Sequence, residues 1–497
     1  MGRWINVQNT ETAIDSNIDN IKNLVGNKSE LVIKYIFIGD KNSLTAAVIY
    51  LNAQADKNII DRDILNPLML HVHEDISTIQ NVDDYLCKKY IAASNTSIET
   101  DINMLPYSIN SGKTVIVLNG ISNFIVIDTS GGTYRQISEP VSDVSLRGPR
   151  EGFIENLDTN ISILRRRIKD KKLTLHKFKL GRRSQSNFVI AFIEDIVDKD
   201  FLQSIEEKIS QIDKDFVSAN STIEQLIEEH TYSVFPQTIG SERPDIIEAA
   251  LMEGRIAFLL EGTPYVTTYP TTFIEFFQTP EDYYGRTVQA FFIRIIRFIA
   301  AFIVITVPAI YITFIKFNTE LIPVEFIESL VESRKGIALT PFMSLLAMNL
   351  TIEFLREGGL RLPGKIGQTL SVVGGIIIGD AAIKAKIVSS ATLFVAGIST
   401  VSSFVISNYQ MSIAIRFLAY PMLILSNWLG VLGIIIGWFF ILSYLCSLEN
   451  FGVPYFEFNK SDMKDTFIRV PIKNMIKRPK IIPNTNPIRQ HFRGKNK

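Results

Sequence analysis

Polar and charged side chains interrupt the apolar C-terminal half of this 497-residue chain. Asn349 and Glu353 lie in one apolar stretch, and Asp380 and Lys384 lie in the next. A charge near the centre of a bilayer costs at least about 2.5–3.5 kcal/mol on insertion scales, so we expect these groups to avoid lipid. Asp380 and Lys384 also have the four-residue spacing of an ion pair on a helix. Two interpretations stay open: the groups cap helix ends near the membrane interface, or they form a buried polar site along an ion path.

Small and polar residues form a second pattern just before Asp380. From Gly364 to Gly379 they follow spacings of four, three, four and four, which places them on one face of a helix. One interpretation is close helix packing, in which small residues let backbones approach. The other is a pore-lining helix in a ring of copies, whose apolar neighbours form a constriction that can dewet and close. The candidate pore or gate residues are Gln368, Ser371, Val372, Val373, Gly375, Ile376 and Gly379.

The elements that position these residues are membrane segments. Residues 298–317 carry no charge before Lys316 and have about the ~20 residues needed to cross a hydrocarbon core. Residues 337–355 and 387–406 are weaker candidates, and the uncharged stretch 417–448 is too long for one simple span. We expect four crossings, with six as the second choice. Three arginines just before the first span and a basic C-terminal tail predict that both ends of the chain are cytoplasmic.

The first 290 residues have the composition of soluble α/β material, in which strand candidates such as Leu31–Ile38 and Thr114–Leu118 alternate with amphipathic helices. Asn119-Gly120 between two β-rich runs predicts a hairpin with a type I′ turn, and Glu261-Gly262 lies between two further strand-like runs. A strand pair at 173–180 and 188–196 is expected between helices at 151–170 and 201–212.

The predicted fold class is therefore an α+β soluble N-terminal region of two α/β subdomains, followed by an all-α polytopic transmembrane domain. The expected boundaries are 1–143 and 144–290 for the subdomains, 291–450 for the membrane domain and 451–497 for the tail. The tail is basic, so we expect it to touch anionic lipid, with the alternative that it serves only to fix the orientation of the chain in the membrane. Its repeated prolines argue against a packed core.

Several function classes find no support in the sequence. Lysine plus arginine and aspartate plus glutamate each number 51, so no global charge indicates nucleic acid as a partner. There is no phosphate-binding loop, GxSxG, HExxH or CxxC motif, so no enzyme, cofactor or metal is expected. His71 and His73 would share a face if they lay on a strand, but they are interpreted as solvent-facing. A lone transporter is disfavoured because the membrane part is short and shows no internal repeat. A structural membrane scaffold stays possible.

The chain resembles the A subunit of the GerA-type spore germinant receptors over roughly residues 145–455. The resemblance rests on long motif blocks: SLRGPREGFIENLDTNISILRRRIKD, SERPDIIEAALMEGRIAFLLEGTPYV, TIEFLREGGLRLPGKIGQTLSVVGGIIIGDAAI and NYQMSIAIRFLAYPMLILSNWLG. Residues 1–140 match only in general character. A SpoVAF-type paralogue shares the architecture and stays as an alternative.

The resemblance implies a multi-pass subunit of the spore inner membrane, with the N-terminal domain and the tail on the core side. It implies partners, namely a transporter-like B subunit that binds the nutrient and a lipoprotein C subunit. It also implies a homo-oligomer, expected to be a pentamer, that acts as a nutrient-gated ion channel releasing monovalent cations. In that case the constriction formed by Val372, Val373 and their apolar neighbours is expected to widen on gating. The sequence of this chain does not identify the germinant.

Overall fold

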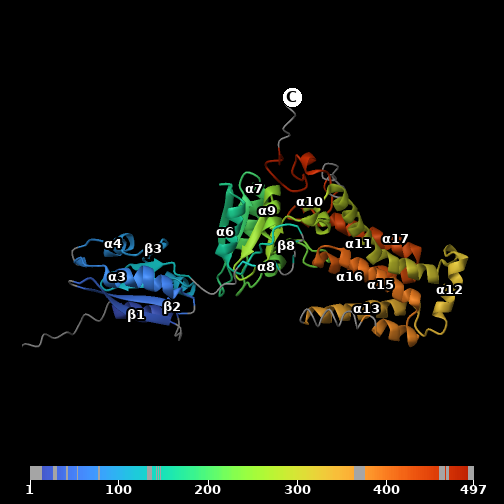
Figure 1. Ribbon diagram of the computed structural model, residues 1–497, viewed down its shortest axis with the longest axis horizontal. Helices are drawn as coiled ribbons and strands as arrows, with labels where there is room; N and C mark the ends of the chain where they lie inside the picture. The colour runs from blue at the N-terminus through green and yellow to red at the C-terminus, as the bar shows by residue number, and fades with distance from the viewer. Residues whose placement is uncertain are drawn as a thin grey trace, which may run out of the picture. The chain divides into compact units, whose positions relative to one another are not determined.

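The computed structural model describes residues 14–25, 31–40, 43–52, 54–76, 79–130, 137–140, 143, 145, 147–362, 375, 377–457, 465 and 469–490. The chain divides into two compact units, 1–134 and 135–497. Figure 1 colours both units along the chain, from blue at the N-terminus to red at the C-terminus.

The first unit is an antiparallel five-stranded sheet in the order β1-β2-β4-β5-β3. Helices α1 and α5 cover one face, and η1, α3 and α4 cover the other. The elements in chain order are α1 (Ile14–Val25), β1 (Leu31–Ile38), β2 (Leu44–Leu51), α2 (Lys57–Ile59), η1 (Ile60–Leu65), α3 (Asn66–Leu70), α4 (Val82–Lys89), β3 (Thr96–Glu99), η3 (Ile102–Met104), α5 (Leu105–Asn110), β4 (Thr114–Leu118) and β5 (Phe124–Ile127).

The apolar run of strand β2 reflects burial on both faces of the sheet. Successive strand residues point to opposite sides. Ala46 and Val48 therefore lie in one core, and Ala47 and Ile49 lie in the other. The predicted strands at 31–38 and 114–118 are confirmed in place.

The hairpin predicted around Asn119-Gly120 is confirmed, but its predicted turn type is wrong. Val117 pairs with Phe124, so the connection is longer than two residues. A type I′ turn needs positive φ at both central residues. Gly120 has φ +77°, whereas Asn119 does not have a positive φ.

The second unit begins with a sheet of the same kind, in the order β6-β7-β9-β10-β8. Helices α6 and α9 cover one face, and α7 and α8 cover the other. The predicted strand pair and the hairpin at Glu261-Gly262 are confirmed. The elements are α6 (Leu157–Arg167), β6 (Leu173–Leu180), β7 (Ser186–Ile193), α7 (Lys199–Ser210), α8 (Asn220–Ile227), β8 (Ile239–Ser241), α9 (Pro244–Glu253), β9 (Ile256–Leu260) and β10 (Val266–Tyr269).

All described strand pairings in both sheets are antiparallel. The two subdomains are thus mixtures of helix and strand built on hairpins. The expectation of α/β subdomains is corrected in this respect, because parallel sheets would need crossover connections in place of hairpins.

A helical region follows the second sheet. Its elements are η4 (Phe273–Phe277), α10 (Glu281–Tyr284), α11 (Thr287–Lys316), η5 (Thr319–Leu321), α12 (Val324–Arg334), α13 (Pro341–Leu360), α15 (Ser390–Val405), α16 (Tyr409–Leu429) and α17 (Val431–Ser447). Among the described residues, α11 and α16 are long and apolar enough to cross a membrane, and α15 and α17 are shorter apolar helices. Helix α11 starts well before residue 298, so Arg294 and Arg297 lie inside it.

Glycines explain how the uncharged stretch 417–448 becomes two helices. Gly430 ends α16 at φ +60° and ψ −133°, a conformation open essentially to glycine alone. A Cβ on Gly433 would lie 2.1 Å from the carbonyl oxygen of Leu425, and one on Gly437 would lie 2.6 Å from Sδ of Met422. Helices α16 and α17 therefore fold back on each other with their backbones in direct contact at these glycines.

The described part of the tail packs against the second sheet unit. It contains β11 (Glu449–Asn450), β12 (Val453–Pro454) and η6 (Ile472–Asn474). Ile482 is fully buried, and Nε of Arg478 donates to the carbonyl oxygen of Met252 at 2.6 Å. The backbone N–H of Thr485 donates to the carbonyl oxygen of Ile196 at 2.9 Å. The proline-rich sequence builds no core of its own here, but it is anchored on the core of its neighbour.

Candidate functional site: charged clusters in and below the helices

Glu353 lies in a cluster of charges among the apolar helices. Helix α13 carries Asn349, Glu353 and Arg356 at spacings of four and three, so they share a face. Oε1 of Glu353 lies 2.9 Å from Nε of Arg416 on α16 and 3.5 Å from Nη1 of Arg356. Both guanidinium groups are largely buried. The carboxylate therefore joins two helices that are distant in sequence.

Hydroxyl groups complete this Glu353 cluster, which we define as Glu353, Arg356 and Arg416. Nη2 of Arg356 donates to Oγ of Ser403 at 3.1 Å, and Nη1 of Arg416 donates to Oγ of Ser412 at 2.9 Å. A cavity of about 30 Å³ lies beside the cluster and is lined by Val304, Asn349, Ile352, Glu353, Arg356, Ser399, Thr400, Arg416, Ala419 and Tyr420. A polar space of this size can hold a water molecule.

The structure brings two of the four predicted intramembrane polar residues, Asn349 and Glu353, to this cavity. The other two, Asp380 and Lys384, form the ion pair that their spacing predicts, with 2.6 Å between Oδ2 and Nζ. Their side chains are 59% and 75% exposed within this single chain. They do not line the cavity beside Glu353.

Sequence reasoning missed the two arginines that neutralise Glu353. Arg356 begins a basic, glycine-rich stretch of sequence, which is not typical of a helix, but helix α13 continues through it to Leu360. Arg416 is a lone charge within the apolar sequence IAIRFLAY. A single arginine in such surroundings is itself a signal of a buried acidic partner, since an unpaired charge there is costly.

The predicted pore stripe is only partly described. Gln368, Ser371, Val372, Val373 and Ile376 lie outside the described residues. Gly375 is exposed, and a Cβ on it would have no atom of the described residues within 4 Å. A Cβ on Gly379 would make ordinary contact with Leu393 at 3.4 Å. Unlike Gly433, neither glycine makes a close helix contact with the part of the chain that the structure describes.

A second charge cluster lies at the start of helix α11. Oδ2 of Asp282 accepts from Nε of Arg294 at 3.0 Å and from Nη1 of Arg297 at 2.8 Å. Nη1 of Arg294 also donates to Oδ1 of Asp465, a tail residue, at 3.0 Å. Burial alone would raise the pKa of Asp282, but the bonds and charges of Arg297 and Arg294 outweigh it and lower this pKa. Burial raises the pKa of Asp465. The tail and the helix base are thus held in one buried ionic network.

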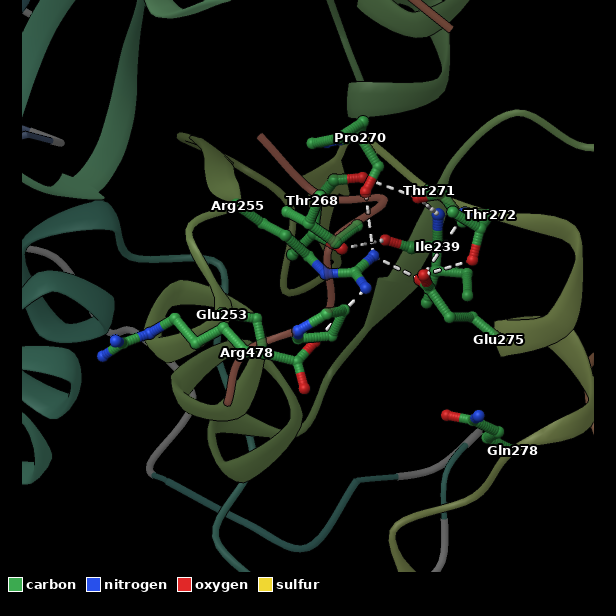
Figure 2. A network of polar contacts seen from close by, with 12 residues as sticks. Ile239, Glu253, Arg255, Thr268, Pro270, Thr271, Thr272, Glu275, Gln278 and Arg478 are labelled. Atoms are coloured by element: carbon green, nitrogen blue, oxygen red, sulfur yellow. Dashed lines mark hydrogen bonds and ion pairs between the residues drawn. The ribbon is translucent and has the colours of Figure 1, made fainter. Parts of the chain in front are cut away.

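A third cluster connects the sheet to the same junction and is centred on Arg255 (Figure 2). This arginine directly precedes β9 and is only 4% exposed. Its Nη1 donates to the carbonyl oxygen of Pro270 at 2.8 Å and to Glu275, and its Nη2 donates to Glu253 at 3.2 Å. Burial disfavours the charged guanidinium, but Glu275 and Glu253 outweigh it and raise the pKa of Arg255. Glu275 lies in η4, so the network ties the sheet to the segment that leads into α11.

The remaining candidate groups lie at the surface. His71 and His73 are not on a strand, so the strand placement considered for them is wrong, and Nδ1 of His73 lies 2.7 Å from Oδ2 of Asp40. Arg182 pairs with Asp213 in an exposed ion pair. Within the described ranges, no group of three or more potential ligands is placed to hold a metal ion.

Comparison with known proteins assigns the chain to a family. The family model described as Bacillus/Clostridium GerA spore germination protein matches residues 19–481. The chain belongs to the GerA family. It is 34% identical over 482 residues to "Spore germination protein KA" of Bacillus subtilis (strain 168), covering 96% of this chain and 88% of that one. It is 31% identical over 463 residues to "Spore germination protein GerLA" of Bacillus cereus, covering 92% and 93%.

Two further matches complete the comparison of this GerA-family chain. "Uncharacterized membrane protein YfkQ" of Bacillus subtilis (strain 168) is 33% identical over 470 residues, covering 94% of this chain and 90% of that one. The crystal structure of the N-terminal domain of the A subunit of the Bacillus megaterium spore germinant receptor GerK3 is 27% identical. It covers 54% of this chain and 99% of that one, with a TM-score of 0.22, which is too low to support an argument about the fold.

Proposed function

We propose that this GerA-family chain is the A subunit of a germinant receptor in the spore inner membrane. The family match over residues 19–481 and relatives named as spore germination proteins support this proposal. Large apolar side chains on the helices also face outward within this chain, among them Phe394, Phe404, Trp428, Phe439 and Phe440. An exposed apolar surface of this kind is suited to lipid or to neighbouring subunits.

We propose further that copies of the chain assemble around a shared axis, as a pentamer, into a channel for monovalent cations. The face that carries Gly375 would line the pore. The support is that a Cβ on this glycine would meet no atom of the described residues, whereas Gly433 and Gly437 of the α16–α17 hairpin are needed for contact inside the chain. A small residue that the described contacts do not require is available for an oligomer interface or a water-filled path.

In this proposal the Glu353 cluster holds the closed state and does not select ions. It contains two guanidinium groups and one carboxylate, so its net positive charge would oppose a passing cation. The observation that carries the gating proposal is the 2.9 Å contact between Glu353 of α13 and Arg416 of α16, beside a water-sized cavity. Helix α13 leads into the segment that contains the predicted constriction at Val372 and Val373.

The expected partners are a transporter-like B subunit that binds the nutrient and a lipoprotein C subunit. The chain would be multi-pass, with its N-terminal units and tail on the core side. An alternative is a non-conducting scaffold or a SpoVAF-type paralogue. The relatives named as spore germination proteins do not favour it.

Ion flux tests the proposal. Proteoliposomes containing the chain with its B and C partners should release trapped K⁺ when nutrient is added. Glu353→Gln weakens the contact with Arg416 and should raise release without nutrient, as should Val372→Ala or Val373→Ala by loosening the constriction. Asp213→Asn, at an exposed ion pair, serves as the control with unchanged release. Absence of nutrient-dependent flux from assembled complexes, or unchanged basal release in all three variants, contradicts the channel proposal.

A further inference from the structure

A cavity of about 590 Å³ lies within the second unit, away from the Glu353 cluster. Its walls come from Asp143, from β8, α9 and β10 with Arg255 between α9 and β9, from the segment η4–α10, from the residues just before α16, and from the tail. This volume falls within the ~300–1,000 Å³ that is typical of small-molecule sites. Ile239, Ile246, Ile472, Met475 and Tyr284 supply apolar and aromatic wall, as such sites require.

The charges in the wall favour a cation. Four carboxylates line the cavity, at Asp143, Asp245, Glu253 and Glu275, against two arginines, Arg255 and Arg489. The wall therefore has two more negative than positive charges. A concave site with walls of low dielectric constant focuses the negative potential of its carboxylates, so it attracts cationic ligands.

Two of these carboxylates are already engaged in strong contacts. Asp245 accepts from Nε and Nη2 of Arg243 and from the hydroxyl of Tyr284. Glu275 accepts from Thr272 and Arg255. Neither has an oxygen without a donor.

The other two keep acceptor capacity. Oδ2 of Asp143 accepts from the hydroxyl of Ser241 at 2.6 Å, and Oδ1 has no hydrogen-bond donor among the described residues. Glu253 accepts from Arg255 at 3.2 Å, and its Oε1 lies 3.6 Å from Nη1 of Arg489. The last distance is longer than a hydrogen bond. Asp143 and Glu253 are thus the two wall carboxylates that a ligand can engage.

The contact between Glu253 and the tail indicates which kind of group this carboxylate binds. Arg489 brings a guanidinium to this carboxylate from a segment more than two hundred residues away in sequence. Its side chain is 35% exposed, so the contact is loose and open to competition by a diffusible cation. Screening and side-chain entropy leave such partly exposed pairs worth about 0–1 kcal/mol.

We propose that this cavity binds a small organic dication of the diamine class, with one ammonium on Glu253 in place of Arg489 and the other on Asp143. The aliphatic part of the ligand would lie against the apolar wall. The proposal does not depend on channel activity. Bound ligand would contact the wall residues Gln278 and Thr279, which bond to the tail at Asp465 and to Arg297 of α11, so occupancy is expected to stiffen this junction.

The test uses the full chain in detergent micelles with 1,4-diaminobutane as the probe. We expect a saturable rise in the melting temperature with the diamine. The neutral 1,4-butanediol and the dianion succinate, which have similar length, should give no rise. High salt should weaken the effect, because the attraction is electrostatic.

Variants locate the site. The double variant Asp143→Asn with Glu253→Gln should weaken diamine binding by at least about tenfold, equivalent to about 1.4 kcal/mol. Ala249→Leu keeps every charge but fills part of the wall, and it should also weaken binding. Asp213→Asn, outside the cavity, should bind as the parent does. Equal response to butanediol, no response to the diamine, or full binding by both the double variant and Ala249→Leu would overturn the proposal.

Discussion

The two sheet-containing parts of the molecule share one topology but are used differently. Each has the order helix, two strands, helices, strand, helix, two strands, and each sheet places its third strand at an edge beside its fifth. Corresponding strands are separated by one constant interval. Leu31 and Leu173, Thr114 and Ile256, and Phe124 and Val266 are each 142 residues apart (173 minus 31, 256 minus 114, 266 minus 124). The chain therefore contains a structural duplication.

Glycines in the turns follow the same interval. Gly39 and Gly181 have φ +92° and +88°, and Gly120 and Gly262 have φ +77° and +87°. Gly112 and Gly254 have φ +84° and +101°. These backbone conformations favour glycine because a Cβ is strained there. Two hairpin turns and one helix end are thus preserved in both parts, even where the side chains around them differ.

What differs is the use of the equivalent positions. The position of Arg255 in the second sheet corresponds to Lys113 in the first, and both backbone N–H groups donate to the equivalent carbonyls, of Ala250 and Ser108. Arg255 reaches Glu275 and Pro270 beyond the sheet, and the tail packs beside it. The comparison teaches that the same fold serves in its second copy as the platform for helix α11.

The largest expected effect comes from a substitution that removes the buried cation of this platform. Arg255→Met should lower the opening free energy of β9 and β10 by about 3–5 kcal/mol, because Glu275 and Glu253 would remain buried without their cation. Lys113→Met, at the equivalent position, should change the opening free energy of β4 by no more than about 0.5 kcal/mol. Hydrogen exchange of the strand amides in the full chain measures both changes separately. Equal losses in the two sheets would contradict the difference in use.

The next effect concerns the base of helix α11. Asp282→Asn leaves Arg294 and Arg297 without their shared carboxylate and should cost about 3 kcal/mol in the opening of α10 and the first turns of α11.

The same substitution should alter the pH dependence. The folded pKa of Asp282 is lowered below the unfolded value of about 3.9, so its contribution to stability is complete above that value and is lost as the pH falls through the folded pKa. Hydrogen exchange of the α10 and α11 amides between pH 3 and 6, with the exchange chemistry corrected for pH, should show this loss in the parent and not in the variant. An identical acid-side slope in both proteins would be the contrary result.

The smallest effect should be equal in both copies. Gly120→Ala and Gly262→Ala each force a Cβ into a left-handed turn, and in each case the new Cβ would have no atom within 4 Å. Each should therefore cost about 1 kcal/mol from backbone strain alone. Exchange of the β4–β5 and β9–β10 hairpin amides provides the measurement. A cost confined to one hairpin would show that the duplication does not extend to its turns.

Much of the N-terminal architecture could be predicted from local patterns. Strands β1 and β4 appear at their predicted residues. The β6–β7 pair and the β4–β5 and β9–β10 hairpins also form as expected. These elements depend on apolar alternation and on glycine turns, which act over a few residues. The duplication is not evident in the sequence, because its two copies share positions of burial and turns more than residue identity.

The candidate sites could be predicted only in part. Glu353 and Asn349 could be predicted as site residues because a polar or charged group in an apolar segment is energetically unfavourable. The ion pair of Asp380 and Lys384 could be predicted from its helical spacing. The partners of Glu353 could not be paired with it, because Arg416 lies on another helix and no local spacing relates the two.

The sequence by itself determined where strands, turns and apolar helices form, because periodic burial and glycine conformations are local properties. Only the tertiary structure decided that the tail docks on the second sheet, that Arg255, Asp282 and Asp465 join that sheet to helix α11, and that four carboxylates surround one cavity. Those contacts join segments separated by tens to hundreds of residues. They depend on the folded chain bringing buried charges together, since each charge is stable in the interior only beside its partner.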